Sequence, residues 1–256
     1  MRMNKALRYI VPSFFIIISI LVFRLAFDFS DWSALLLCPL VIVVYMGNYS
    51  LVLAPWKAKF HLVVRDESWL SKWLTGRLGA GLKSATLAIV MFLFIIWQSV
   101  SATIVELVLI SILFIITSVT YIKVVQSSPK HFYEPFDRSV SSSFSIWMVT
   151  IPAVIILLIY TWSIKTLPSE ILDEDFQQVI RLAAQKSPGD KGWISSIISF
   201  FYLFDSVKLW AVVQLQDYPL LTLIYSLDTA LFGYVLCKTA VIVTNFVITY
   251  VIKEDK

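Results

Sequence analysis

Long apolar stretches separated by short polar connections run through the whole chain. A bilayer crossing needs about 20 largely apolar residues in a helix. Stretches of this kind lie near residues 9–27, 33–54, 84–100, 102–125, 141–163, 193–215 and 220–251. The pattern predicts an all-α membrane protein, with residues 1–256 forming a single seven-helix transmembrane domain. Six spans with one re-entrant segment are the alternative, because Asp205 and Lys208 make the sixth stretch the weakest.

The basic residues predict an orientation. Most Lys and Arg residues outside the apolar stretches fall at the N-terminus and in the connections that would share its side of the membrane. Cytoplasmic segments carry this excess of positive charge. We therefore expect the N-terminus in the cytoplasm and, with seven spans, the C-terminus outside.

One connection has a helical pattern of its own. Residues 168–187 start at Pro168 and carry an apolar stripe that includes Phe176 and Val179, and a Ser187–Pro188–Gly189 stop follows. Such a segment is typical of an amphipathic helix at a membrane surface. We expect an interfacial helix on the outer side.

The composition supports a membrane protein and excludes an ordinary soluble domain. The chain is 59% hydrophobic and 15% charged, which is too little polar surface for an ordinary soluble domain. No metal-ligand spacing, glycine-rich nucleotide loop or catalytic Ser/His/Asp arrangement is present. We expect no metal, no enzyme activity and no nucleic-acid partner. The lipid bilayer is the expected surrounding, and the plasma membrane the expected location.

Several ionisable residues lie inside the apolar stretches, where charge is expensive and often functional. Arg24 and Glu106 are near helix ends and can reach the interface, and Asp205 can neutralise Lys208 three residues later. The acidic residues that could relay protons are Glu106, Asp205 and Asp228.

Lys238 is harder to explain by packing. It stands in the middle of the last stretch with apolar neighbours on both sides, too deep for its ammonium to reach the interface. Either a carboxylate pairs with it, for which Asp205 is the candidate at similar depth, or the amine is neutral or used in a Schiff base.

Local sequences along the chain resemble the heliorhodopsin family, microbial-type rhodopsins with inverted membrane orientation. The similar stretches are Asp28–Phe29, Ser84–Ala85–Thr86, Ala102–Thr103–Ile104–Val105, Ile151–Pro152, Ser199 to Ser206, Gln214 and Lys238–Thr239–Ala240. Their order and spacing carry the resemblance. They identify the chain as a divergent member.

The resemblance implies a light-sensing protein that is not an obvious ion pump, with all-trans retinal bound to Lys238 as a Schiff base. It also implies a homodimer and an unknown signalling partner. Aromatic residues expected to line a retinal slot are Trp147, Phe200, Phe201, Phe204 and Trp210.

Two departures from the family pattern change the expected photochemistry. No acidic residue lies in Arg77–Leu78–Gly79–Ala80, where the family has its counterion, and Tyr234 replaces a small hydroxyl residue one turn before Lys238. We predict Asp205 as counterion and Tyr234 as hydrogen-bond partner. The alternatives are a light-gated or passive proton- or ion-conducting rhodopsin variant, and a retinal-free transporter, channel or permease subunit.

Overall fold

A computed structural model describes residues 5–63, 76–134, 136–163, 176–186, 192–214 and 227–252, and these residues form helices joined by short turns. The elements are α1 (Lys5–Phe27), η1 (Asp31–Leu37), α2 (Cys38–Val63), α4 (Arg77–Ser101), α5 (Ile104–Ser127), η2 (Ser128–Lys130), α6 (Asp137–Ser163), α8 (Phe176–Lys186), α9 (Trp193–Gln214), α11 (Leu227–Phe246) and η3 (Val247–Val251).

Six helical segments of the described chain are long and apolar enough to cross a membrane. They are Ile10–Phe27, Asp31–Lys59, Arg77–Ser101, Ile104–Lys130, Asp137–Ile156 and Ala230–Val251. These match the first five predicted stretches and the last one. The protein is therefore an all-α, multi-pass membrane protein.

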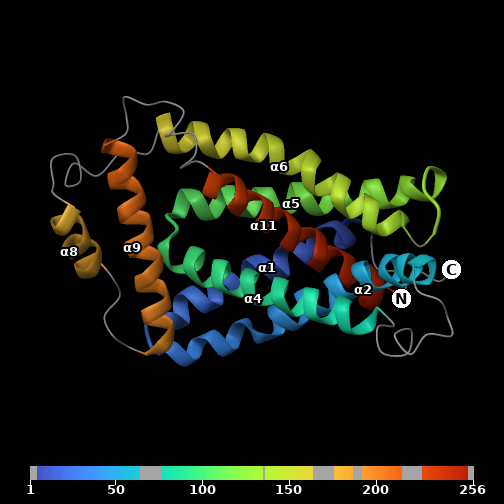
Figure 1. Cartoon of the computed structure of the whole chain (residues 1–256), viewed down its shortest axis with the longest axis horizontal. Helices are drawn as coiled ribbons and strands as arrows, with labels where there is room; N and C mark the ends of the chain where they lie inside the picture. The colour runs from blue at the N-terminus through green and yellow to red at the C-terminus, as the bar shows by residue number, and fades with distance from the viewer. Residues whose placement is uncertain are drawn as a thin grey trace.

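The sixth predicted stretch forms a helix with a different placement. Residues 193–215 were expected to cross the membrane, and they form the helix α9, which runs across one end of the bundle (Figure 1). Asp205 and Lys208 are the two charged residues of α9, and its other residues are largely apolar. The described helices confirm the first five predicted spans and the last one, and the crossing by residues 193–215 stays a prediction.

Helix α8 lies beside α9, on the side away from the bundle (Figure 1). It confirms a helix within the predicted segment 168–187, whose residues 168–175 and 187 lie outside the described residues. Val179 is fully buried, and the Phe176 ring lies 5.0 Å from the Trp210 ring of α9. The apolar stripe of α8 therefore packs on α9.

A buried carboxylate holds the start of α9 against the bundle. Asp31 of η1 is 5% exposed, and its Oδ2 accepts hydrogen bonds from the backbone N–H groups of Ile194 (3.0 Å) and Ser195 (3.2 Å). Its Oδ1 accepts a hydrogen bond from the Ser195 hydroxyl at 2.8 Å. Gly192 has φ +149°, and a Cβ there would lie 2.7 Å from Asp31 Oδ2. Asp31 thus supplies the acceptor that the first N–H groups of a helix need.

Helix α11 is the central element of the bundle. In its span 67% of the residues are buried, against 28–39% in the other five, and it packs on α6, α2, α5 and α1. The contact with α2 is close at Gly47, where a Cβ would overlap the backbone carbonyl of Ile242. A residue placed mid-way along α11 therefore lies at the centre of the molecule.

The first and last described helices share one end of the bundle. The start of α1 and the end of η3 lie together, at the end opposite α9 (Figure 1). An even number of crossings requires this arrangement. It differs from the seven-span expectation, in which the C-terminus lay on the opposite side from the N-terminus.

Candidate functional site

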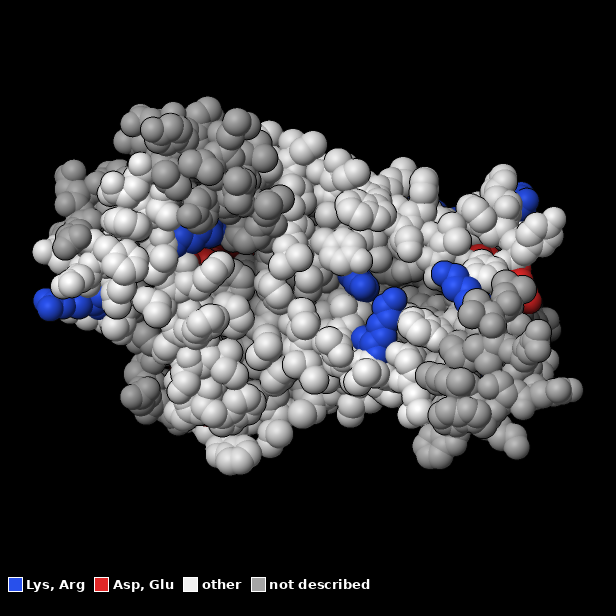
Figure 2. Space-filling view, in the orientation of Figure 1, with Lys and Arg blue, Asp and Glu red and all other residues white. Residues whose placement is uncertain are grey.

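Lys238 lies in the middle of α11, on its more open face. Residues 235–237 and 239–245 are buried, whereas Lys238 is half-buried and Leu231, two turns earlier, is 55% exposed. Figure 2 shows basic side chains near the middle of one face, over α11 and α4. Lys238 is the one basic residue of α11.

Two other predicted residues lie with Lys238. Its Nζ donates a hydrogen bond to the Tyr234 hydroxyl oxygen at 3.4 Å and lies 5.4 Å from the centre of the same ring. The Tyr234 ring in turn contacts Trp147 of α6, with ring centres 5.9 Å apart. The structure therefore brings together the amine, a hydroxyl one helical turn away and an indole from a neighbouring helix.

Asp205 does not join this group. Within the described part of the chain, Lys238 makes no ion pair with a carboxylate, because α9 crosses the end of the bundle instead of running beside α11. Asp205 instead acts on Tyr202 of the same helix: burial raises the pKa of the Tyr202 hydroxyl, Asp205 raises that pKa further, and Arg24 of α1 lowers it. Arg24 donates a hydrogen bond to the carbonyl of Ala102 at 2.7 Å.

The aromatic residues predicted to line one slot lie in three places. Trp147 contacts Tyr234, and Trp210 contacts Phe176 of α8. Phe201 stacks on Trp97 of α4 at 5.1 Å and touches Phe200, while Phe204 is 51% exposed. Phe94 and Phe232 complete the group around Trp97. The sequence interpretation did not include Trp97, Phe94 or Phe232, because their partners come from distant helices.

The predicted acidic relay is not continuous among the described side chains. Glu106 is part of a capping box: its Oε2 accepts the Thr103 N–H at 2.8 Å, and its own N–H bonds to the Thr103 hydroxyl at 3.3 Å. The Thr-x-x-Glu pattern could have indicated this cap from the sequence. Asp205 lies on α9, and the side chain of Asp228 lies outside the described residues.

The sequence did not lead us to expect a buried polar network in the half of the bundle near the chain ends. Asn245 accepts a hydrogen bond from the Tyr121 hydroxyl at 3.0 Å and donates to the Ser50 hydroxyl at 2.8 Å and the Gly47 carbonyl at 3.2 Å. Beside it, Ser118 accepts hydrogen bonds from the hydroxyls of Ser13 and Thr244, each at 3.0 Å.

Asn48 adds a further contact by donating to the Ser84 hydroxyl at 2.9 Å. These bonds link α1, α2, α4, α5 and α11. The signal was present in the sequence as asparagines deep in apolar stretches, where polar side chains need partners.

The described side chains suit amine chemistry and hydrogen bonding. They contain no group of His, Cys, Asp and Glu that could hold a metal ion. Cys237 is buried and accepts a hydrogen bond from the Thr117 hydroxyl at 3.7 Å. The chain matches no family model, no curated protein and no solved structure.

Proposed function

We propose that this multi-pass membrane protein senses light through all-trans retinal bound to Lys238 as a Schiff base. The observation that carries the proposal is the position of the Lys238 amine: half-buried, mid-way along the central helix, with a tyrosine hydroxyl as its hydrogen-bond partner. A charged amine at this depth is costly, and an imine removes that cost.

The residues around the amine fit its attachment to an aldehyde. Lys238 supplies the nitrogen that would hold the group, and the Tyr234 hydroxyl can donate a hydrogen bond to that nitrogen once it is uncharged. Trp147 fixes the Tyr234 ring from α6. Retinal, when bound, would supply a polyene that absorbs light.

The charge state of the proposed Schiff base follows from the residues around Lys238. A protonated Schiff base in a low-dielectric site needs a nearby anion, otherwise its pKa falls. Among the described residues no carboxylate pairs with Lys238. The proposed pigment is therefore neutral in the dark and absorbs in the near ultraviolet.

Reconstitution with retinal tests this function. The wild-type protein should acquire a near-ultraviolet band that acid shifts into the visible range, and Lys238→Ala should not acquire it. Lys238→Arg is the matched control, because it keeps the positive charge but cannot form an imine. A pigment that forms equally well in Lys238→Arg would contradict the proposal.

A second candidate function is a retinal-free channel or transporter, and the buried polar network favours it. Hydroxyls and amides at membrane depth commonly line ion or proton pathways. Proton flux into liposomes should then fall in Asn245→Leu, while Lys238→Arg should conduct like wild type. Retinal-dependent absorption without such flux would favour the first function.

The homodimer, the signalling partner and the plasma-membrane location are further parts of the light-sensing proposal. The cytoplasmic placement of both chain ends belongs to it as well, supported by the excess of basic residues near the N-terminal side.

A further inference from the structure

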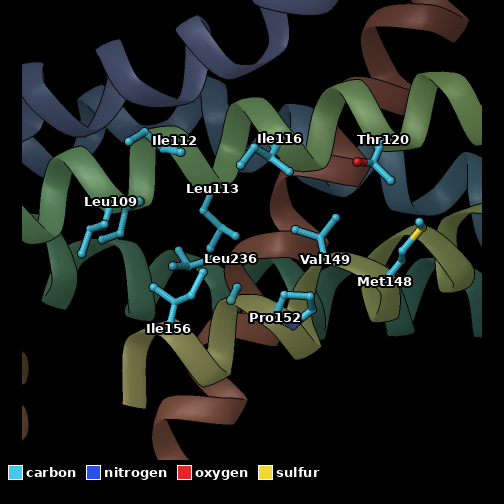
Figure 3. A pocket seen from close by; sticks show the side chains of 12 residues that line it. Leu109, Ile112, Leu113, Ile116, Thr120, Met148, Val149, Pro152, Ile156 and Leu236 are labelled. Atoms are coloured by element: carbon cyan, nitrogen blue, oxygen red, sulfur yellow. The ribbon is translucent and has the colours of Figure 1, made fainter. Parts of the chain in front are cut away.

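A cavity of about 270 Å³ lies between α5 and α6, away from the Lys238 site. Its walls include Leu109, Ile112 and Ile116 on one side and Ile156 on the other, and Leu236 of α11 lies at its base (Figure 3). Leu236 is two residues from Lys238, so the two side chains leave α11 on nearly opposite faces. The cavity therefore needs an explanation separate from that of the amine.

The walls of the cavity define an apolar ligand. Its lining contains no charged residue, and both walls belong to segments apolar enough to cross a membrane. Apolar protein cavities of roughly 150 Å³ can bind a molecule the size of benzene, so this one has room for a longer apolar group.

One end of the cavity is polar. Pro152 has no N–H, so the carbonyl of Met148, four residues earlier, lacks its usual helical donor. The Thr120 hydroxyl of α5 forms no hydrogen bond within the described part of the chain. Figure 3 shows Met148 and Thr120 on opposite walls at the same end, with Leu109 and Ile156 at the other. A hydroxyl and a backbone carbonyl that lacks its helical donor thus belong to residues at the same end of the cavity, at a depth where unpaired polar groups are costly.

We infer that this cavity binds a membrane amphiphile with one apolar chain and a single uncharged hydroxyl head group. The ligand hydroxyl donates to the Met148 carbonyl and accepts a hydrogen bond from Thr120, while the chain lies along α5 towards Leu109. Thr120 is ten residues from the end of its span at Lys130, which is about 15 Å along the helix. A phospholipid keeps its head group at the interface and cannot place a donor at that depth.

Photolabelling of the full-length protein in lipid nanodiscs tests the inference, with a diazirine analogue of hexadecanol as the probe. We expect labelling concentrated on the cavity walls of α5 and α6, and competition by unlabelled hexadecanol but not by hexadecane. Thr120→Val should weaken the competition about five- to tenfold, the effect of one lost hydrogen bond, and Thr120→Ser should retain it. Ala153→Phe, which fills the cavity, should abolish the labelling.

Labelling spread evenly over the lipid-facing helices would overturn the inference. So would equal competition by hexadecane, or unchanged competition in Thr120→Val. The competition between hexadecanol and hexadecane uses wild-type protein alone, so it tests the inference even if Ala153→Phe fails to fold.

Discussion

Lys238 and Tyr234 form the proposed site along one helix, four residues apart. This spacing places two side chains on the same helical face, so α11 alone sets the hydrogen bond between them. A contact between Asp205 and Lys238 depends on the direction of α9, and α9 crosses the end of the bundle instead of running beside α11. A contact within one helix could therefore be predicted from spacing, whereas a contact between helices could not.

The position of Asp205 leads to a spectroscopic prediction. Asp205→Asn should leave the near-ultraviolet band of the retinal-reconstituted protein unchanged, because Asp205 does not pair with the Lys238 nitrogen. Absorption spectra of the two proteins in the same detergent check this. A visible band in the wild type that Asp205→Asn moves into the ultraviolet would show that Asp205 is the counterion after all.

Gly47 permits the close contact between α2 and α11, which leads to a second prediction. Gly47→Ala should lower the free energy of unfolding by about 1–3 kcal/mol, since its methyl group would overlap the Ile242 carbonyl. Gly81→Ala is the matched control: its Cβ would meet the Tyr45 hydroxyl at an ordinary 3.6 Å. The control should be neutral or more stable by about 0.5–1 kcal/mol, as a helical glycine replaced by alanine usually is.

Thermal unfolding of both variants in detergent measures the difference. Equal losses in Gly47→Ala and Gly81→Ala would mean that the α2–α11 contact is looser than described.

Among the elements, α9 separates the described fold from the one expected. Its start is held by Asp31, and its Phe201 ring stacks on Trp97 near the end of α4. Both contacts hold α9 across one end of the bundle (Figure 1). The position of α9 therefore depends on side chains that are distant in the sequence.

Removing the cap should loosen the start of α9. Asp31→Ala leaves the N–H groups of Ile194 and Ser195 without an acceptor, a loss of about 0.5–2 kcal/mol. Hydrogen exchange of those amides should become several-fold faster, while α11 should remain protected. Ser196→Ala is the control, because the exposed Ser196 hydroxyl bonds to the Gly192 carbonyl and not to η1. Unchanged exchange in Asp31→Ala would show that α9 is held by its aromatic contacts alone.

The helices themselves could be predicted from the sequence, but the placement of α9 could not. The first five expected spans follow from apolar length, and so does the last span with its central lysine. Residues 193–215 are also apolar and long, so length alone predicted a crossing. The Asp31–Ser195 contact that places α9 joins residues 164 positions apart, and no local pattern indicates it.

At the scale of the whole molecule, the start of α1 and the end of η3 lie at the same end of the bundle (Figure 1). The seven-span interpretation places them on opposite sides. The number of crossings therefore changes the side that the C-terminus faces, and with it the surface available to a signalling partner.

Reporter fusions distinguish the two arrangements. Green fluorescent protein fused to the C-terminus should fluoresce, and alkaline phosphatase there should be inactive, because the basic residues predict cytoplasmic chain ends. A fusion after Lys130, on the predicted cytoplasmic side, is the positive control. Active phosphatase at the C-terminus would instead support seven crossings.

Reduction of the retinal-treated protein with borohydride, followed by mass spectrometry of its peptides, tests the central proposal most directly. We expect a retinyl group on the peptide that contains Lys238 and on no other lysine peptide. We expect no adduct in Lys238→Arg. An unmodified Lys238 peptide, or retinyl groups distributed over surface lysines, would contradict the proposed function.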